Sequence, residues 1–170
     1  MRVVAVVGNP NRGGRTTAVA ERVAGRIASL AEGDVEVIEL IDLAGELFNW
    51  ASPSMAEVTA LVRSADAAVF ACPTYKAGVT GLLKAFLDRY GTDGLAGLVA
   101  VPVMLGGSGH HAMAVETSLR PVLVELAATV PTRGLYVVDS ELDHLDDTID
   151  AWWQLASTPL RLLLNPTPIR

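Results

Sequence analysis

A glycine-rich segment with two arginines and two threonines follows the first apolar run of the chain. From residue 8 to residue 17 it reads GNPNRGGRTT. Glycines let backbone amide groups approach a ligand closely, and hydroxyl groups at the start of a helix add donors to its free N–H groups. Arg12 and Arg15 supply positive charge. The segment therefore favours a bound anion, and a phosphate monoester suits it well.

This segment differs from two common nucleotide-binding loops. It lacks the Gly-Lys-Ser/Thr that closes the P-loop of nucleotide triphosphatases, and it does not keep the G-x-G-x-x-G spacing of dinucleotide-binding folds. The alternative interpretation is a glycine-rich turn capped by threonine, with arginines that are simply solvated. The two interpretations are compatible, because the start of a helix favours an anion in either case.

A second segment, residues 72–78 with the letters CPTYKAG, follows an apolar run and leads into an amphipathic stretch. A proline at the end of a strand stiffens the backbone. Thr74, Tyr75 and Lys76 add donors and an aromatic edge, which suit a planar polar ligand. The alternative for Tyr75 is a half-buried ring that only packs.

A third segment, residues 106–111 with the letters GGSGHH, offers amide groups without bulky side chains. Such amides can donate to the carbonyl edge of a planar ring and stabilise negative charge that develops there. His110 and His111 raise the possibility of a metal site or a general base. Adjacent residues do not share a helix face, and no nearby cysteine or carboxylate completes a ligand set. We expect no metal, and a ring contact or a simple helix start instead.

Five short apolar runs alternate with longer amphipathic stretches along the chain. Strands are expected at 2–7, 34–40, 67–72, 98–105 and 135–138, and helices at 16–30, 55–64, 79–90, 115–126 and 145–158, with a break near Pro159. This alternation predicts the α/β class, with right-handed crossovers, a doubly wound parallel sheet and helices on both faces. Ligands of such sheets bind at the carboxyl ends of the strands, so the loops after the first, third and fourth strands should converge.

The composition narrows the function further. A chain of 170 residues suits a single domain, 1–170, and a net charge of −6 argues against nucleic-acid binding. The one cysteine, Cys72, excludes an internal disulfide framework and suits a small buried side chain. The apolar run at 3–7 is too short for a signal peptide, and no run is long enough to span a membrane. We therefore expect a soluble, cytoplasmic protein, whose apolar tail at 160–170 docks on a neighbouring subunit.

Three signatures in this order resemble the NADPH-dependent FMN reductase family, a flavodoxin-like group that includes the flavin reductases of two-component monooxygenases. They read GNPNRGGRTT, PTYKAGVTGLLKAFLD and GGSGHHAMAVETSLRPVLVELAATVPTRGLYV. The similarity runs from Arg2 to about Asp139. It implies a five-stranded flavodoxin-like sheet of order 2-1-3-4-5, FMN as the flavin, NADPH or NADH as the hydride donor, and a homodimer or homotetramer.

The resemblance also implies the residues that bind the flavin, in three groups. The first surrounds the FMN phosphate, the second contacts the isoalloxazine ring and the ribityl chain, and the third faces the pyrimidine edge of the ring. In that order the groups are Asn9, Arg15, Thr16 and Thr17; Pro73, Thr74, Tyr75 and Lys76; and Gly106, Gly107 and Ser108. We also expect that Arg12 reaches the dinucleotide phosphate.

Two departures from the family pattern bear on these expectations. The family's first loop usually has serine where Asn9 stands and arginine where Asn11 stands. Some relatives that release free reduced flavin carry an extra bulky residue near Thr117, where this chain is small. Pro121 has no N–H, so the carbonyl of Thr117 lacks its usual helical partner, and this predicts a kink or widened turn near Thr117.

The predicted activity is NAD(P)H-dependent reduction of FMN, with reduced FMN passed to a monooxygenase partner. We expect no catalytic acid or base, because the flavin itself carries hydride transfer. One alternative is a quinone or azo reductase that keeps FMN tightly bound. Two others are a flavodoxin-type electron carrier, which the modest charge disfavours, and a flavin-binding module without turnover.

Overall fold

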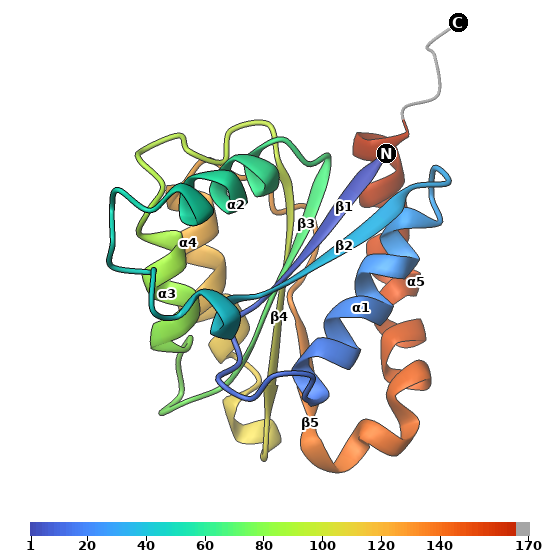
Figure 1. Ribbon diagram of the computed structural model, residues 1–170. Coiled ribbons are helices and arrows are strands. Elements are labelled where there is room, and N and C mark those ends of the chain that lie inside the picture. The colour runs from blue at the N-terminus through green and yellow to red at the C-terminus, as the bar shows by residue number, and fades with distance from the viewer. Residues whose placement is uncertain (166–170) are drawn as a thin grey trace, which may run out of the picture.

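Five parallel strands form the centre of the fold, which a computed structural model describes for residues 1–165 (Figure 1). The strands run side by side in the order β2-β1-β3-β4-β5. They are β1 (Arg2–Val7), β2 (Asp34–Glu39), β3 (Ala67–Pro73), β4 (Val99–Gly106) and β5 (Leu135–Val138). This order confirms the predicted flavodoxin-like sheet, in which the direction of the crossovers reverses beside β1 and β3.

Helices cover both faces of the sheet, as the alternating pattern predicts. In Figure 1, α1 and α5 lie together on one face, and α2, α3 and α4 lie on the other. Their bounds are α1 (Arg15–Ala28), α2 (Pro53–Arg63), α3 (Gly81–Leu87), α4 (Arg120–Glu125) and α5 (Leu145–Leu164).

The sheet separates two apolar cores because side chains alternate between its faces. Along β1, Val4 and Val6 pack with the α2, α3 and α4 side, whereas Val3, Ala5 and Val7 pack with the α1 and α5 side. All five are fully buried. The two-sided burial explains why this strand is a continuous apolar run. This burial also holds the carboxyl ends of the strands in place, and the loops that follow them begin there.

The helix after β4 is widened at the predicted position. Val115–Leu119 forms a π-helix that leads directly into α4. Pro121 cannot donate to the carbonyl of Thr117, and the wider turn accommodates this missing bond. The wider turn also carries Ser118, whose Oγ accepts a hydrogen bond of 2.8 Å from the N–H of Val79. The predicted widened turn is therefore confirmed.

Two predicted helix ends are wrong. The helix predicted at 79–90 begins later, because the Thr80 hydroxyl accepts from the N–H of Leu83 and caps α3 at Gly81. At the other end of the chain, α5 continues through Pro159 instead of breaking there. Proline frees the carbonyl four residues earlier, on Leu155, and Leu155 is exposed, so water can satisfy that carbonyl.

The predicted tail lies partly within α5 and partly outside the described residues. Leu160 is buried in the chain's own core, whereas Leu162 and Leu163 are exposed. Residues 166–170 lie outside the described residues, so docking of the tail on a neighbouring subunit stays a prediction. Within residues 1–165, no helix is long and apolar enough to cross a membrane.

Candidate functional site

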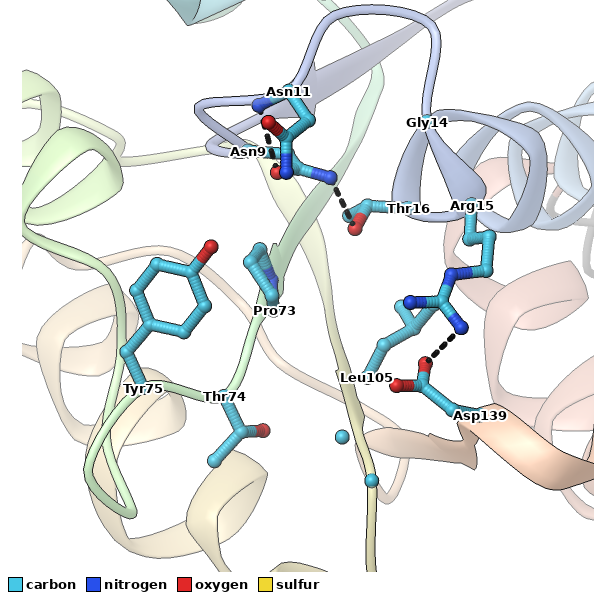
Figure 2. A pocket seen from close by; sticks show the side chains of 12 residues that line it. Asn9, Asn11, Gly14, Arg15, Thr16, Pro73, Thr74, Tyr75, Leu105 and Asp139 are labelled. Carbon is cyan, nitrogen blue, oxygen red and sulfur yellow. Dashed lines mark hydrogen bonds and ion pairs between the residues drawn. The ribbon is translucent and has the colours of Figure 1, made fainter.

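The loops after β1, β3 and β4 meet at one cavity of about 330 Å³ at the carboxyl edge of the sheet (Figure 2). Its volume lies within the usual range for small-molecule sites. The lining residues come from these loops, from the start of α1 and from the residue after β5. They are Asn9, Asn11, Gly14, Arg15, Thr16, Pro73, Thr74, Tyr75, Leu105, Gly106, Gly107 and Asp139.

In the first loop, a short chain of hydrogen bonds fixes the side chain of Asn9. Its Oδ1 accepts from the N–H of Asn11 at 3.0 Å, and its Nδ2 donates to Oγ1 of Thr16 at 3.0 Å (Figure 2). Asn9 and Thr16 are both buried. Because Oγ1 of Thr16 already accepts from Asn9, the hydroxyl hydrogen of Thr16 remains available to a ligand in the cavity.

The start of α1 adds backbone donors to the same side of the cavity. The N–H groups of Thr17 and Ala18 both bond to the carbonyl of Gly14, at 3.0 and 3.3 Å. The N–H groups of Arg15 and Thr16 come earlier in the helix, where no intrahelical acceptor exists. The first turn carries no acidic side chain. The helix dipole and these N–H groups therefore favour an anion here.

Thr17 does not line the cavity and instead holds this loop through a contact with β2. Its hydroxyl donates to Oε1 of Glu39 at 3.1 Å, and the N–H of Gly13 donates to the same oxygen at 2.9 Å. Gly13 has a φ of 61°, which suits a residue without Cβ. Glu39, at the end of β2, thus holds both the turn and the first helical residues in place.

The second loop is a two-residue hairpin turn. Tyr75 and Gly78 exchange both backbone hydrogen bonds, at 3.1 and 3.0 Å, and the central Lys76 and Ala77 have φ values of 51° and 61°. Positive φ at both central positions is the geometry of a type I′ turn, which non-glycine residues adopt at a cost. The turn leaves Tyr75 about half exposed at the cavity and places the exposed Lys76 outside the lining.

Thr74 lies between this turn and β4. Its N–H donates to the carbonyl of Leu105 at 2.6 Å, which holds the loop beside the strand. Its Oγ1 is buried and has no hydrogen-bond partner among the described residues. An unpartnered buried hydroxyl is costly, so Oγ1 of Thr74 is available to bond a polar group that enters the cavity.

The third loop presents backbone rather than side chains. A Cβ on Gly106 would collide with the hydroxyl group of Tyr136, whereas Gly107 has open space around it. Tyr136 donates to the carbonyl of Ser108 at 3.0 Å, and Oγ of Ser108 accepts from the N–H of His110 at 3.2 Å. Ser108 therefore bonds within its own loop and does not line the cavity.

An ion pair at one side of the cavity joins α1 to the residue after β5. The guanidinium of Arg15 lies 3.4 Å from the carboxylate of Asp139 (Figure 2). Arg12 points away to an exposed pair with Asp42, at 3.1 Å. Within residues 1–165, no group of three or more His, Cys, Asp or Glu side chains is placed to hold a metal ion.

Most of the predicted site residues lie together, and four lining residues were not predicted. The predicted residues that line the cavity are Asn9, Arg15, Thr16, Pro73, Thr74, Tyr75, Gly106 and Gly107, whereas Thr17, Lys76 and Ser108 do not line it. The additional lining residues are Asn11, Gly14, Leu105 and Asp139. Asn11 and Gly14 belong to the glycine-rich signature and could have been included. No sequence signal marks Asp139, because it follows a strand whose loop has no motif.

Comparison with known proteins identifies the family. Residues 1–143 match the model of the family described as NADPH-dependent FMN reductase. The chain belongs to this family. Two similar relatives are a FMN reductase (NADPH) of Escherichia coli (strain K12) and the NADH-dependent FMN reductase SfnE of Pseudomonas putida. Each is 31% identical to this chain; the matches cover 91% and 84% of this chain, and 89% and 79% of the relatives.

The solved structures agree with this family membership. The apo form of an NADH:FMN oxidoreductase, named EMOB, is 31% identical to this chain. It superposes with a TM-score of 0.78, covering 98% of this chain and 97% of that one. The likeness therefore extends over the sheet, the cavity edge and the helices that carry the site.

Proposed function

We propose that this member of the family is an NAD(P)H-dependent FMN reductase whose flavin binds in the cavity at the carboxyl edge of the sheet. The observation that carries the proposal is the donor set at the start of α1. The backbone N–H groups of Arg15 and Thr16, the Thr16 hydroxyl and the Arg15 guanidinium all lie at one end of the cavity. This set suits the phosphate of FMN.

The other end of the cavity suits a flat polar ring. Tyr75 and the backbone of Gly106 and Gly107 line it. The buried hydroxyl of Thr74, which has no hydrogen-bond partner among the described residues, can bond a polar atom of the ring or its ribityl chain. Backbone N–H groups at Gly106 and Gly107 would stabilise negative charge at the pyrimidine edge of the ring.

FMN, when bound, supplies the hydride chemistry itself. The chain's own residues bind and orient. The α1 donors would hold the phosphate, and the type I′ turn would hold Tyr75 beside the ring. Tyr75 is half exposed, so that side of the cavity stays open to a nicotinamide ring. No side chain of the lining set is required to move a proton.

Steady-state turnover tests the proposal. Catalytic amounts of protein with excess FMN should consume NADPH or NADH continuously, and the comparison of the two donors gives the preference. Consumption no faster than with free FMN alone would contradict a reductase and indicate an electron carrier, which needs a separate reductase, or a binding module. Stopped-flow measurement gives the rate at which the reduced flavin is oxidised by a quinone and by a trap for free reduced flavin. Comparing the two rates separates a quinone or azo reductase from a reductase that releases reduced FMN.

The physiological setting is part of the same proposal. The protein acts in the cytoplasm as a homodimer or homotetramer and passes reduced FMN to a monooxygenase. An open groove of about 340 Å³ between α3 and α4 supports association, since most of its lining is apolar. The lining residues are Leu87, Tyr90, Pro121, Val122 and Leu126, together with the charged Lys84, Asp88 and Glu125. Light scattering coupled to size exclusion measures the oligomeric state, and a monomer at micromolar concentration would contradict it.

A further inference from the structure

The charges that line the cavity cancel within the protein itself. Among the described lining residues, Arg15 is the one cation and Asp139 the one carboxylate, and they form an ion pair at 3.4 Å. Within residues 1–165, the Asp139 carboxylate has no other ion-pair or hydrogen-bond partner, so Arg15, the arginine that a phosphate needs, is its one partner. An anionic ligand therefore meets a cation whose charge is already balanced.

We propose that Asp139 is a specificity-determining residue that weakens binding of the FMN phosphate, so that FMN exchanges as a substrate instead of staying as a permanent cofactor. This inference rests on the proposed function. A flavin phosphate carries a charge of about −1.5 to −2 at neutral pH. Asp139 acts on it in two ways, because it competes for Arg15 and because it repels the incoming phosphate.

The opposite effect, in which Asp139 holds Arg15 ready for the phosphate, is the weaker one. The pair is loosely held and open to solvent, with side-chain exposures of 65% for Arg15 and 32% for Asp139. An exposed ion pair orders its side chains little. The neutral donors at the start of α1 are fixed by the helix and remain in place without Asp139. Repulsion and competition therefore dominate.

Flavin titrations of Asp139→Asn and Asp139→Ala test the inference. Both should bind FMN about three- to tenfold more tightly than the unaltered protein at low ionic strength, and the gain should shrink as salt is added. Riboflavin has no phosphate, so its dissociation constant should change less than about twofold, in keeping with an effect confined to the phosphate charge. The KM for FMN should fall in parallel.

A matched control is available farther along α1. Arg22 and Asp146 form an ion pair of 2.7 Å between α1 and α5, outside the cavity. Asp146→Asn removes the same charge from the chain, so any change that it causes in FMN affinity reports the effect of net charge alone. Its FMN affinity should stay at the unaltered value.

Three results would overturn the inference. FMN could bind Asp139→Asn no more tightly than before, riboflavin could gain as much affinity as FMN, or Asp146→Asn could reproduce the gain. Failure of the unaltered protein to bind FMN at all is a distinct result, which would remove the proposed function together with this inference. Normal FMN binding without a gain in either Asp139 variant would remove the inference alone.

Discussion

The hydroxyl oxygen of Ser118 accepts a hydrogen bond of 2.8 Å from the backbone N–H of Val79. This bond ties the π-helix Val115–Leu119 to the end of the loop that carries Tyr75. Thr80, the next residue, donates from its hydroxyl to the carbonyl of Gly8 at 2.7 Å. The widened turn, the second loop and the first loop are thus connected through adjacent residues.

Ser118→Ala should loosen the second loop. The N–H of Val79 loses its acceptor in a partly buried position, which should lower the free energy of unfolding by about 1 kcal/mol. The KM for FMN should rise while kcat changes less, because the loop positions the ring. Thr117→Ala is the control, since the Thr117 hydroxyl donates to the carbonyl of Met113 in the turn just before the π-helix. Equal effects of the two variants on KM would contradict the proposed connection.

Ala77→Gly should stabilise the protein. Ala77 has a φ of 61° in the turn, where glycine is favoured, and relief of this strain should exceed the gain in chain entropy of the unfolded state. We expect an increase of up to about 1 kcal/mol, measured by urea unfolding. Ala85→Gly, in the middle of α3, should have the opposite sign because glycine disfavours helices. A destabilised Ala77→Gly variant would mean that the turn is not type I′.

Glu39 should matter for flavin binding although it does not line the cavity. Glu39→Ala removes the acceptor of both Gly13 and Thr17, so the phosphate loop should loosen and the KM for FMN should rise. Glu39→Gln keeps a carbonyl oxygen in the same place and should retain most of the affinity. Riboflavin affinity should change little in either variant. If Glu39→Gln weakens FMN binding as much as Glu39→Ala, the negative charge and not the hydrogen bonds is responsible.

Burial of Cys72 should lower the free energy of unfolding at alkaline pH. Burial raises the pKa of the Cys72 thiol from 9.0 to about 11. Below pH 9 the thiol is neutral in both states and the folded protein keeps its full stability. Between pH 9 and 11 only the unfolded state loses the proton, so the free energy of unfolding falls, by roughly 1 kcal/mol per pH unit.

Cys72→Ala isolates this contribution. The variant lacks the thiol, so the difference in unfolding free energy between it and the unaltered protein should be constant below pH 9 and should narrow between pH 9 and 11. Burial also raises the pKa of the Tyr90 hydroxyl, but Tyr90 is present in both proteins and cancels from the comparison. A difference that stays constant up to pH 11 would contradict the burial of Cys72.

The sequence predicts the central strands well because β1, β3 and β4 are buried on both faces and therefore read as apolar runs. The edge strand β2 is more exposed, and the alternation of Val35 and Val37 marks it instead. Pro121 marks the widened turn, since a missing N–H is a local property. The predicted helix break near Pro159 is wrong, because the exposure of Leu155 and the burial of Leu160 depend on tertiary packing. Asp139 is missed for a similar reason: only the folded sheet brings it beside Arg15.

Within the site, sequence patterns identify the loops but not the direction of each side chain. Thr16 and Thr17 are adjacent and identical, yet one lines the cavity and the other bonds to Glu39 at the end of a different strand. Neighbouring residues on a helix point about 100° apart, and the partner that captures the second hydroxyl lies 22 residues away. Such a contact is set by the topology of the sheet.

The dissociation constants of FMN and riboflavin for Thr16→Ala, compared with Thr16→Ser, test the central claim that the phosphate binds at the start of α1. A hydrogen bond to a charged group is worth about 1.5–3 kcal/mol, so Thr16→Ala should bind FMN about tenfold more weakly or worse. Riboflavin should bind as before, and Thr16→Ser, which keeps the hydroxyl, should restore FMN affinity. Unchanged FMN affinity in Thr16→Ala would place the phosphate elsewhere and contradict the account.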